Sequence, residues 1–146
     1  MGILNRCQPL KDLLHFLGII KGHRQRFHLG WVRPDRTIGD FLDFLKEKGF
    51  RSGFRAWSDS GQELSLRKVV DNFFQYHLRI FHDGEVRGHY EKTPEDFPIA
   101  HFLEWGLESR RPDFLAIIGD WLVHNPGEKE IIAWEETHKA SFVRKN

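Results

Sequence analysis

Residues 76–91 constrain the fold more than any other stretch, because they predict a β-hairpin and decide which side chains share a face. Two runs rich in β-branched and aromatic residues flank Asp83-Gly84. This dipeptide is a strong short-range signal for a tight turn between antiparallel strands. The hairpin can pair in two registers, and the choice between them decides the chemistry of its two faces.

The length of the loop selects the register. A two-residue loop would place apolar side chains of one strand opposite charged side chains of the other, so that neither face would be apolar. A three-residue loop, His82 to Gly84, gathers the apolar side chains on one face if Gly84 takes the left-handed conformation and forms a bulge. Because a slip of one residue exchanges the faces, we predict the three-residue loop. Its apolar face then holds Tyr76, Leu78, Ile80, Val86, Gly88 and Tyr90.

The opposite face of this hairpin is polar. It sets His77 opposite His89 and Arg79 opposite Arg87. Since like charges directly opposite each other are destabilising, the two arginines require an anion. That anion is either a phosphate of a partner or a carboxylate of this chain, and the candidate carboxylates are those of Glu95, Glu104 and Glu108. One face of an antiparallel sheet is commonly solvated, so this polar face is either open to solvent or covered, and the functional hypotheses that use it require it to be open.

The remaining elements follow in an irregular order. Apolar spacing predicts helices at residues 9–17, 38–45, 65–73, 99–106 and 114–122, and strands at 27–31, 53–57, 130–134 and 140–143. Residues 69–74 would also suit a strand. Helices do not alternate regularly with single strands, which disfavours a doubly wound parallel sheet. We therefore predict an α+β fold with a mostly antiparallel sheet around the hairpin, helices packed on one face, and a single domain spanning residues 1–146.

Positive charge is concentrated in the first two-thirds of the chain. Residues 1–92 contain 16 Lys/Arg and 11 Asp/Glu, whereas residues 93–146 contain 6 and 10. The acidic third can dock on the basic part, or a basic face can remain available to an acidic partner.

The strand expected at residues 27–31 lies within a basic and aromatic segment. Its apolar residues alternate with polar ones, and the candidate anion-binding residues in and around it are Arg24, Arg26, His28 and Arg33. Interleaved cations and rings suit single-stranded nucleic acid, because the charges follow the backbone and the rings stack on bases. An ordinary amphipathic strand with solvated ends explains the same pattern if Trp31 belongs to the core.

Several classes of protein lack support in the sequence. There is no Gly-rich phosphate loop, Cys-x-x-Cys, His-Glu-x-x-His or Gly-x-Ser-x-Gly motif, and no cofactor is predicted. His77, His82 and His89 fall close together, but no carboxylate clearly joins them, so no metal site is predicted. A lone Cys7 precludes an intrachain disulfide, and no apolar run is long enough for a membrane span. These features favour the cytoplasm.

Three functional hypotheses remain. The first is a binding module for nucleic acid or another polyanion, which uses Arg79 and Arg87 together with the basic-aromatic strand. The second is a protein-interaction or accessory subunit without chemistry of its own, able to bind a partner or to self-associate. The third is a phosphodiester-cleaving enzyme in which His77 and His89 act as acid and base beside the two arginines.

Overall fold

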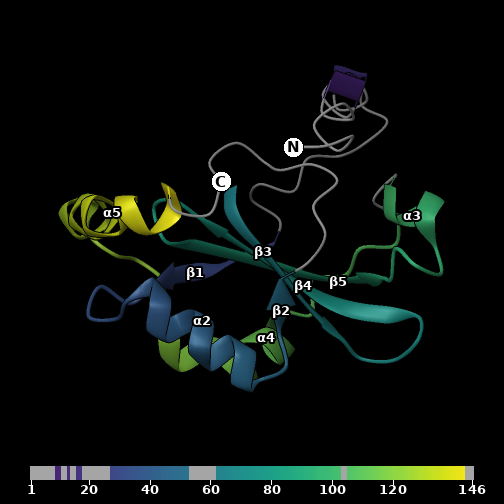
Figure 1. Cartoon of the computed structure of the whole chain (residues 1–146), viewed down its shortest axis with the longest axis horizontal. Helices are drawn as coiled ribbons and strands as arrows, with labels where there is room; N and C mark the ends of the chain where they lie inside the picture. The colour runs from purple at the N-terminus through teal and green to yellow at the C-terminus, as the bar shows by residue number, and fades with distance from the viewer. Residues whose placement is uncertain are drawn as a thin grey trace.

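The protein is built on one open antiparallel sheet. The computed structural model describes residues 9–10, 13, 16–17, 27–52, 62–102 and 105–143. Six strands pair in the order β2-β3-β4-β5-β1-β6. Their bounds are β1 His28–Val32, β2 Arg51–Ser52, β3 Gln62–Val69, β4 Phe74–Phe81, β5 Glu85–Lys92 and β6 Leu122–Val123. The α+β class and the mostly antiparallel sheet are thus confirmed (Figure 1).

The central hairpin has the predicted register. Tyr76 pairs with Tyr90, Leu78 with Gly88, and Ile80 with Val86. Gly84 has a φ of +86° and donates its backbone N–H to the carbonyl of Phe81 at 2.9 Å. A left-handed backbone of this kind favours glycine, which explains why the loop closes at this position.

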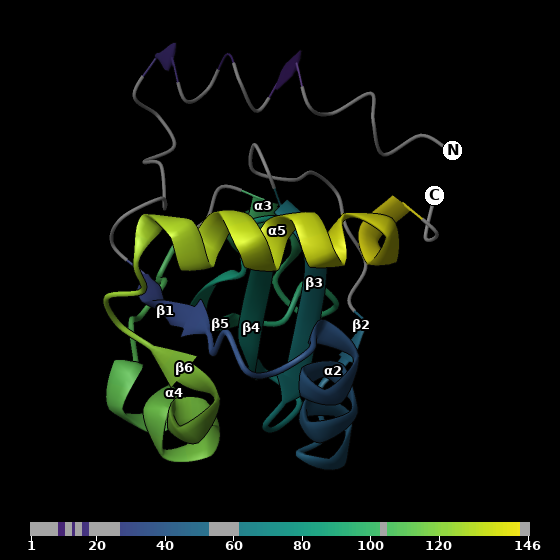
Figure 2. The same cartoon turned by 90° about the vertical axis from the view of Figure 1, so that its left-hand side faces the viewer.

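Two helices cover the apolar face of the sheet. Helix α2 (Ile38–Glu47) and helix α4 (Arg111–Ile118) lie beneath it, as Figures 1 and 2 show. The core consists of apolar side chains from the sheet and from these helices, among them Leu66, Leu78, Ile80, Val86, Phe41, Leu45, Phe114 and Ile118. The apolar alternation along β4 and β5 is therefore what attaches the hairpin to the helices.

Helix α2 begins at a side-chain cap. The Thr37 hydroxyl accepts a hydrogen bond from the Asp40 backbone N–H at 3.1 Å and donates to the Asp40 carboxylate at 2.8 Å. These bonds satisfy one of the free donors at the helix start and place a carboxylate in the first turn. The predicted start of this helix is thereby confirmed.

We expect Thr37→Ala to lower the free energy of unfolding by about 1 kcal/mol, because it removes this cap. Thr137→Ala is the matched control, since Thr137 lies within helix α5 (Glu128–Val143) and its hydroxyl bonds only to the carbonyl of Ala133. That control should be neutral or slightly stabilising, because alanine is the better helix former. Urea unfolding of the two variants measures the difference. Equal midpoints would show that the cap contributes nothing.

The predicted helix at 65–73 is wrong. Residues 62–69 form β3, which pairs with β4 along its length. The Asp71 carboxylate accepts the backbone N–H groups of Phe73 and Phe74 at 2.7 and 3.0 Å, so that it builds the turn between the two strands. An Asp side chain that bonds to the backbone two residues ahead is a turn signal, and here it competes successfully with the helical spacing of Leu66, Val69 and Phe73.

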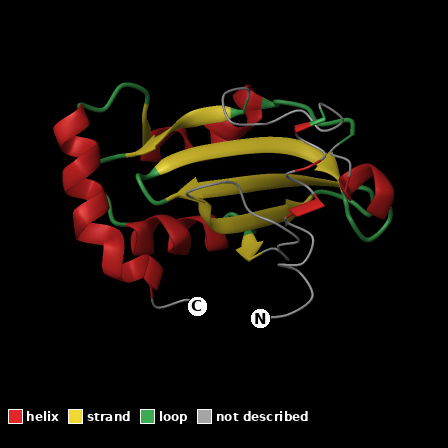
Figure 3. Ribbon diagram, turned by 90° about the horizontal axis from the view of Figure 1, so that it is seen from above, coloured by secondary structure: helices red, strands yellow, loops and turns green. Residues whose placement is uncertain are grey.

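The predicted strands at 130–134 and 140–143 are also wrong, because both segments belong to α5. Its buried side chains, Trp134, His138 and Phe142, recur every four residues and so form one helical face. Trp134 packs over Gly84 and donates its indole N–H to the carbonyl of Arg36 at 3.2 Å. This helix thereby lies across the end of the sheet where the hairpin turns (Figure 3).

Other expected elements are confirmed in part or fall outside the described residues. The strand at 27–31 corresponds to β1, and the helix at 99–106 is short, α3 (Pro98–Phe102). The helix at 114–122 ends earlier, because α4 continues into a 3-10 turn, η2 (Gly119–Trp121), and then β6. The strand expected at 53–57 and most of the helix at 9–17 lie outside the described residues. None of the helices the structure describes has the length and apolar character required to cross a bilayer.

Candidate functional site

The polar face of the hairpin carries the predicted histidines and arginines on one side. His77 pairs directly with His89, and Arg79 with Arg87. This juxtaposition confirms the register, because period-2 alternation sends all four side chains away from the helices that cover the apolar face.

This face is not open, although the hypotheses that use it require it to be. Arg79 is 7% exposed, His89 2% and Glu91 4%. The Arg87 guanidinium donates to Glu85 through Nε at 2.7 Å and Nη2 at 2.6 Å, in a two-pronged ion pair that neutralises it. The arginine pair therefore offers little free positive charge to a phosphate.

The carboxylate beside Arg87 is not one of those the sequence suggested. Glu85, on the same strand, accepts from Arg87 and also contacts His28 Nδ1 at 2.9 Å. Glu95 instead pairs with Arg67, and Glu108 pairs with Arg110 at 2.9 Å. Residues two apart on one strand share a face, and this local geometry explains why Glu85, and not a more distant glutamate, lies beside Arg87.

The remaining predicted anion-binding residues are distributed differently. Arg33 makes a two-pronged contact with Asp35 at 2.9 and 3.1 Å, and the hydrogen bond and charge of that carboxylate raise the pKa of Arg33. His28 is held by Glu85 and lies against Trp31, with 4.6 Å between ring centroids. Arg24 and Arg26 lie outside the described residues. The basic-aromatic strand is thus a structural part of the sheet where it is described.

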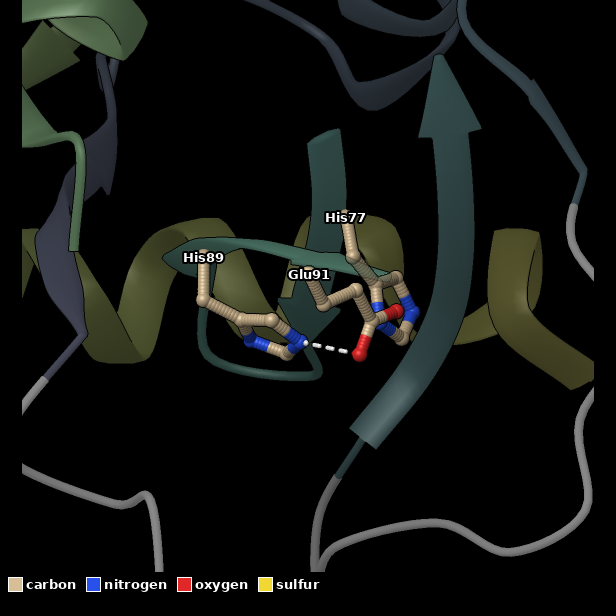
Figure 4. A group of neighbouring side chains, drawn as sticks. All are labelled: His77, His89 and Glu91. Atoms are coloured by element: carbon tan, nitrogen blue, oxygen red, sulfur yellow. Dashed lines mark hydrogen bonds and ion pairs between the residues drawn. The ribbon is translucent and has the colours of Figure 1, made fainter. Parts of the chain in front are cut away.

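Glu91 is the residue that sequence reasoning missed. Its two carboxylate oxygens contact Gln75 Nε2 at 2.8 Å, His89 Nε2 at 3.0 Å and His77 Nδ1 at 3.2 Å (Figure 4). The sequence does contain a signal for Glu91, because the register that pairs His77 with His89 also pairs Gln75 with Glu91 on the same face. Two imidazoles and one carboxylate therefore converge at one point of the sheet.

Burial controls the charge of this cluster. Desolvation lowers the pKa of His89 to about 4, and the neighbouring Glu91 only partly opposes the effect. His89 is consequently a neutral imidazole near neutral pH. Its ring lies edge-on against that of His77, with 5.0 Å between centroids. A phosphodiester could lie between the two histidines only if the rings moved apart.

His77 also connects this cluster to strand β3. Its Nε2 lies 2.7 Å from the Ser65 hydroxyl, while its Nδ1 faces Glu91. Hydroxyl, imidazole and carboxylate thus follow one another in the order found in serine nucleophiles. Ser65 is buried, at 8% exposed, and lines neither of the two hollows described below, so this order alone does not indicate an enzyme.

A hollow lies elsewhere, between α2 and the β2–β3 edge. It has a volume of about 430 Å³, and its apolar lining comes from Leu42, Phe50, Leu64 and Leu66. A smaller hollow of about 160 Å³ shares Leu42 and Leu64 and continues toward Phe142 of α5. We call the two together the edge groove.

Two of the residues that line the edge groove are basic, and further lysines lie on the same elements. Lys46 and Arg51 line it, Lys48 lies over the Phe44 ring at 5.4 Å, and the Lys68 side chain runs along Gly49. Within the described part of the chain, neither Lys46 nor Arg51 pairs with a carboxylate. Asp43 is the one acidic residue of the lining. This group could not be predicted from the sequence, because it forms only when the last turn of α2 meets β2.

An exposed apolar set lies at the far end of the sheet. Val69, Val70 and Phe73, around the β3–β4 turn, are each about half exposed, and Ile99 of α3 is 69% exposed. Surfaces of this kind often bind other proteins. The protein-interaction alternative therefore stays a prediction.

Comparison with known proteins gives no further guidance. The chain matches no family model, no curated protein and no solved structure.

Proposed function

We propose that this chain is a binding module for an anionic polymer, with single-stranded nucleic acid as the first candidate, and that the polymer binds in the edge groove. The observation that carries the proposal is that two exposed cations, Lys46 and Arg51, line an apolar hollow and pair with no carboxylate among the described residues. Phosphates would contact these cations, and a base would enter the hollow.

The surrounding charges support this location over the hairpin face. On the hairpin face Glu85 already neutralises Arg87, whereas at the edge groove Arg51 sits directly opposite Arg67 on the neighbouring strand. Two adjacent arginines raise the local positive potential, and of the two only Arg67 has an acidic partner among the described residues, Glu95. A mobile anion would relieve the repulsion that remains.

The double variant Lys46→Gln/Arg51→Gln tests this proposal. Fluorescence anisotropy with a labelled single-stranded oligonucleotide should give weaker binding, because two phosphate contacts are lost. The slope of log K against log salt should become shallower by about 1.4, which corresponds to two contacts on a single strand.

The matched control is Lys129→Gln/Lys139→Gln, which removes the same charge from exposed positions on α5. Its salt slope should remain that of the wild type if the groove is the binding site. Equal losses in the two double variants would indicate unspecific attraction to net charge, and absence of binding at low salt would refute the proposal.

A further inference from the structure

We propose that His77, His89 and Glu91 form a binding site for one divalent transition-metal ion, with zinc as its representative. This site is on the polar face of the hairpin and is independent of the edge groove. One ligand atom from each of the three side chains lies within 4.8 Å of the others. Figure 4 shows both imidazoles directed toward the carboxylate that stands between them.

The backbone accounts for the convergence. His77 and His89 are directly opposite each other on β4 and β5, and Glu91 follows His89 by two residues on the same face. Side chains in these three positions of an antiparallel pair are nearest neighbours. The hairpin register therefore assembles three ligands from only two strands, both anchored in the core by their other face.

The spacing of the ligand atoms already approaches that of a coordination shell. Zinc binds nitrogen and oxygen at about 2.0–2.2 Å, so two ligands of a tetrahedral site are roughly 3.3 Å apart. Glu91 lies 3.0 Å from His89 Nε2 and 3.2 Å from His77 Nδ1. These contacts involve different oxygens of Glu91, and the three ligand atoms lie within 4.8 Å of one another, so the side chains would have to come closer around one ion.

The chemistry of the ligands selects the class of ion. Two imidazole nitrogens and one carboxylate are the ligand set of many catalytic zinc centres and of non-haem iron sites. Magnesium and calcium prefer shells of oxygen, so they should compete poorly. Arg79 lies near the cluster on the same face, and its positive charge repels any cation that binds there. This repulsion favours an ion that forms strong bonds to nitrogen over an ion that is attracted by charge alone.

Polar groups of the surrounding shell are in position as well. The Ser65 hydroxyl lies 2.7 Å from His77 Nε2, the ring nitrogen that points away from Glu91. Gln75 donates to Glu91 Oε1 at 2.8 Å. Such contacts orient metal-binding histidines and carboxylates in known sites. Three protein ligands leave a coordination position for water or a substrate.

Calorimetric titration of the full chain with zinc, after treatment with a chelator, tests the site. We expect one zinc ion per chain and no heat with magnesium. Ser65→Ala should weaken zinc binding by about 10–100-fold, since it removes an orienting contact. Glu91→Gln, which keeps the size of the side chain, and His77→Gln should weaken it further, because each removes a ligand.

His82→Gln is the matched control, because His82 also contacts a glutamate, Glu135 at 2.7 Å, but belongs to no group of three candidate ligands among the described residues. Its zinc affinity should equal that of the wild type. Wild-type protein that takes up no zinc, or a Glu91→Gln variant that binds as tightly as the wild type, would overturn the proposal.

Cobalt absorption of the wild type gives a second readout that needs no variant. Strong visible bands of four-coordinate cobalt are expected, and they should disappear when zinc is added. A spectrum identical to that of cobalt in water would exclude the site, even if the Glu91 and His77 variants failed to fold.

Discussion

Acidification from pH 6.5 to about pH 4 should lower the free energy of unfolding of the metal-free protein by about 3 kcal/mol through His89 alone. Burial depresses the pKa of this imidazole from its ordinary 6.5 to about 4 in the folded protein. Between these values the unfolded chain binds a proton that the folded chain does not. Neutral His89 therefore contributes fully to the free energy of unfolding above pH 6.5. This contribution declines as the pH falls from 6.5 to about 4, and it changes no further below about pH 4.

The difference between two pH profiles isolates this effect from that of the carboxylates. Urea unfolding is measured across the window for the wild type and for His89→Gln, whose amide can still donate a hydrogen bond to Glu91. The wild type should lose more stability with acid than the variant does. Thr137→Ala serves as the control, because it changes no titratable group and should leave the pH dependence of the wild type unchanged. Parallel profiles for the wild type and His89→Gln would contradict the depressed pKa.

The hairpin could be predicted to the exact residue pair because its signals are local. Asp83-Gly84 marks the turn, and the alternation on either side decides between only two registers. Every pair in this register joins residues close in sequence, from Ile80–Val86 outward. No distant contact had to be known.

Strand β3 and helix α5 could not be predicted, because distant contacts decide them. Residues 65–73 carry a spacing that suits a helix, but pairing with β4 requires an extended chain. Residues 130–134 are rich in strand formers, yet Trp134 closes the hairpin end of the core only from a helix. Local preferences are weak where tertiary packing opposes them.

Part of the candidate metal site could be predicted from the sequence. The two histidines follow from the hairpin register, and Glu91 lies one step further along the same face. The role of Ser65 could not be predicted, because its contact with His77 depends on β3, and the sequence pattern predicts a helix there. The burial of this face could not be read from the hairpin, since alternation identifies which side chains share a face and not what surrounds them.

Gly88 is the position where substitution should damage the core most. It is buried on β5, and a Cβ atom there would lie 2.9 Å from Leu78 Cδ2 and 2.9 Å from two atoms of the Phe114 ring. Both neighbours are fully buried, so neither can move aside freely. Gly88→Val should lower the free energy of unfolding by about 3 kcal/mol, at the upper end of the range for overpacked cores.

A second substitution distinguishes overpacking from a general intolerance of side chains in the hairpin. Phe114→Leu removes the ring edge that the valine would meet, so the double variant Gly88→Val/Phe114→Leu should be more stable than the two separate losses predict. Gly39→Ala, at an exposed position on α2 with no atom closer than 3.8 Å, should instead stabilise the protein by up to about 1 kcal/mol. Strictly additive losses in the double variant would mean that Phe114 is not what excludes a side chain at Gly88. The close approach of α4 to the sheet would then need another explanation.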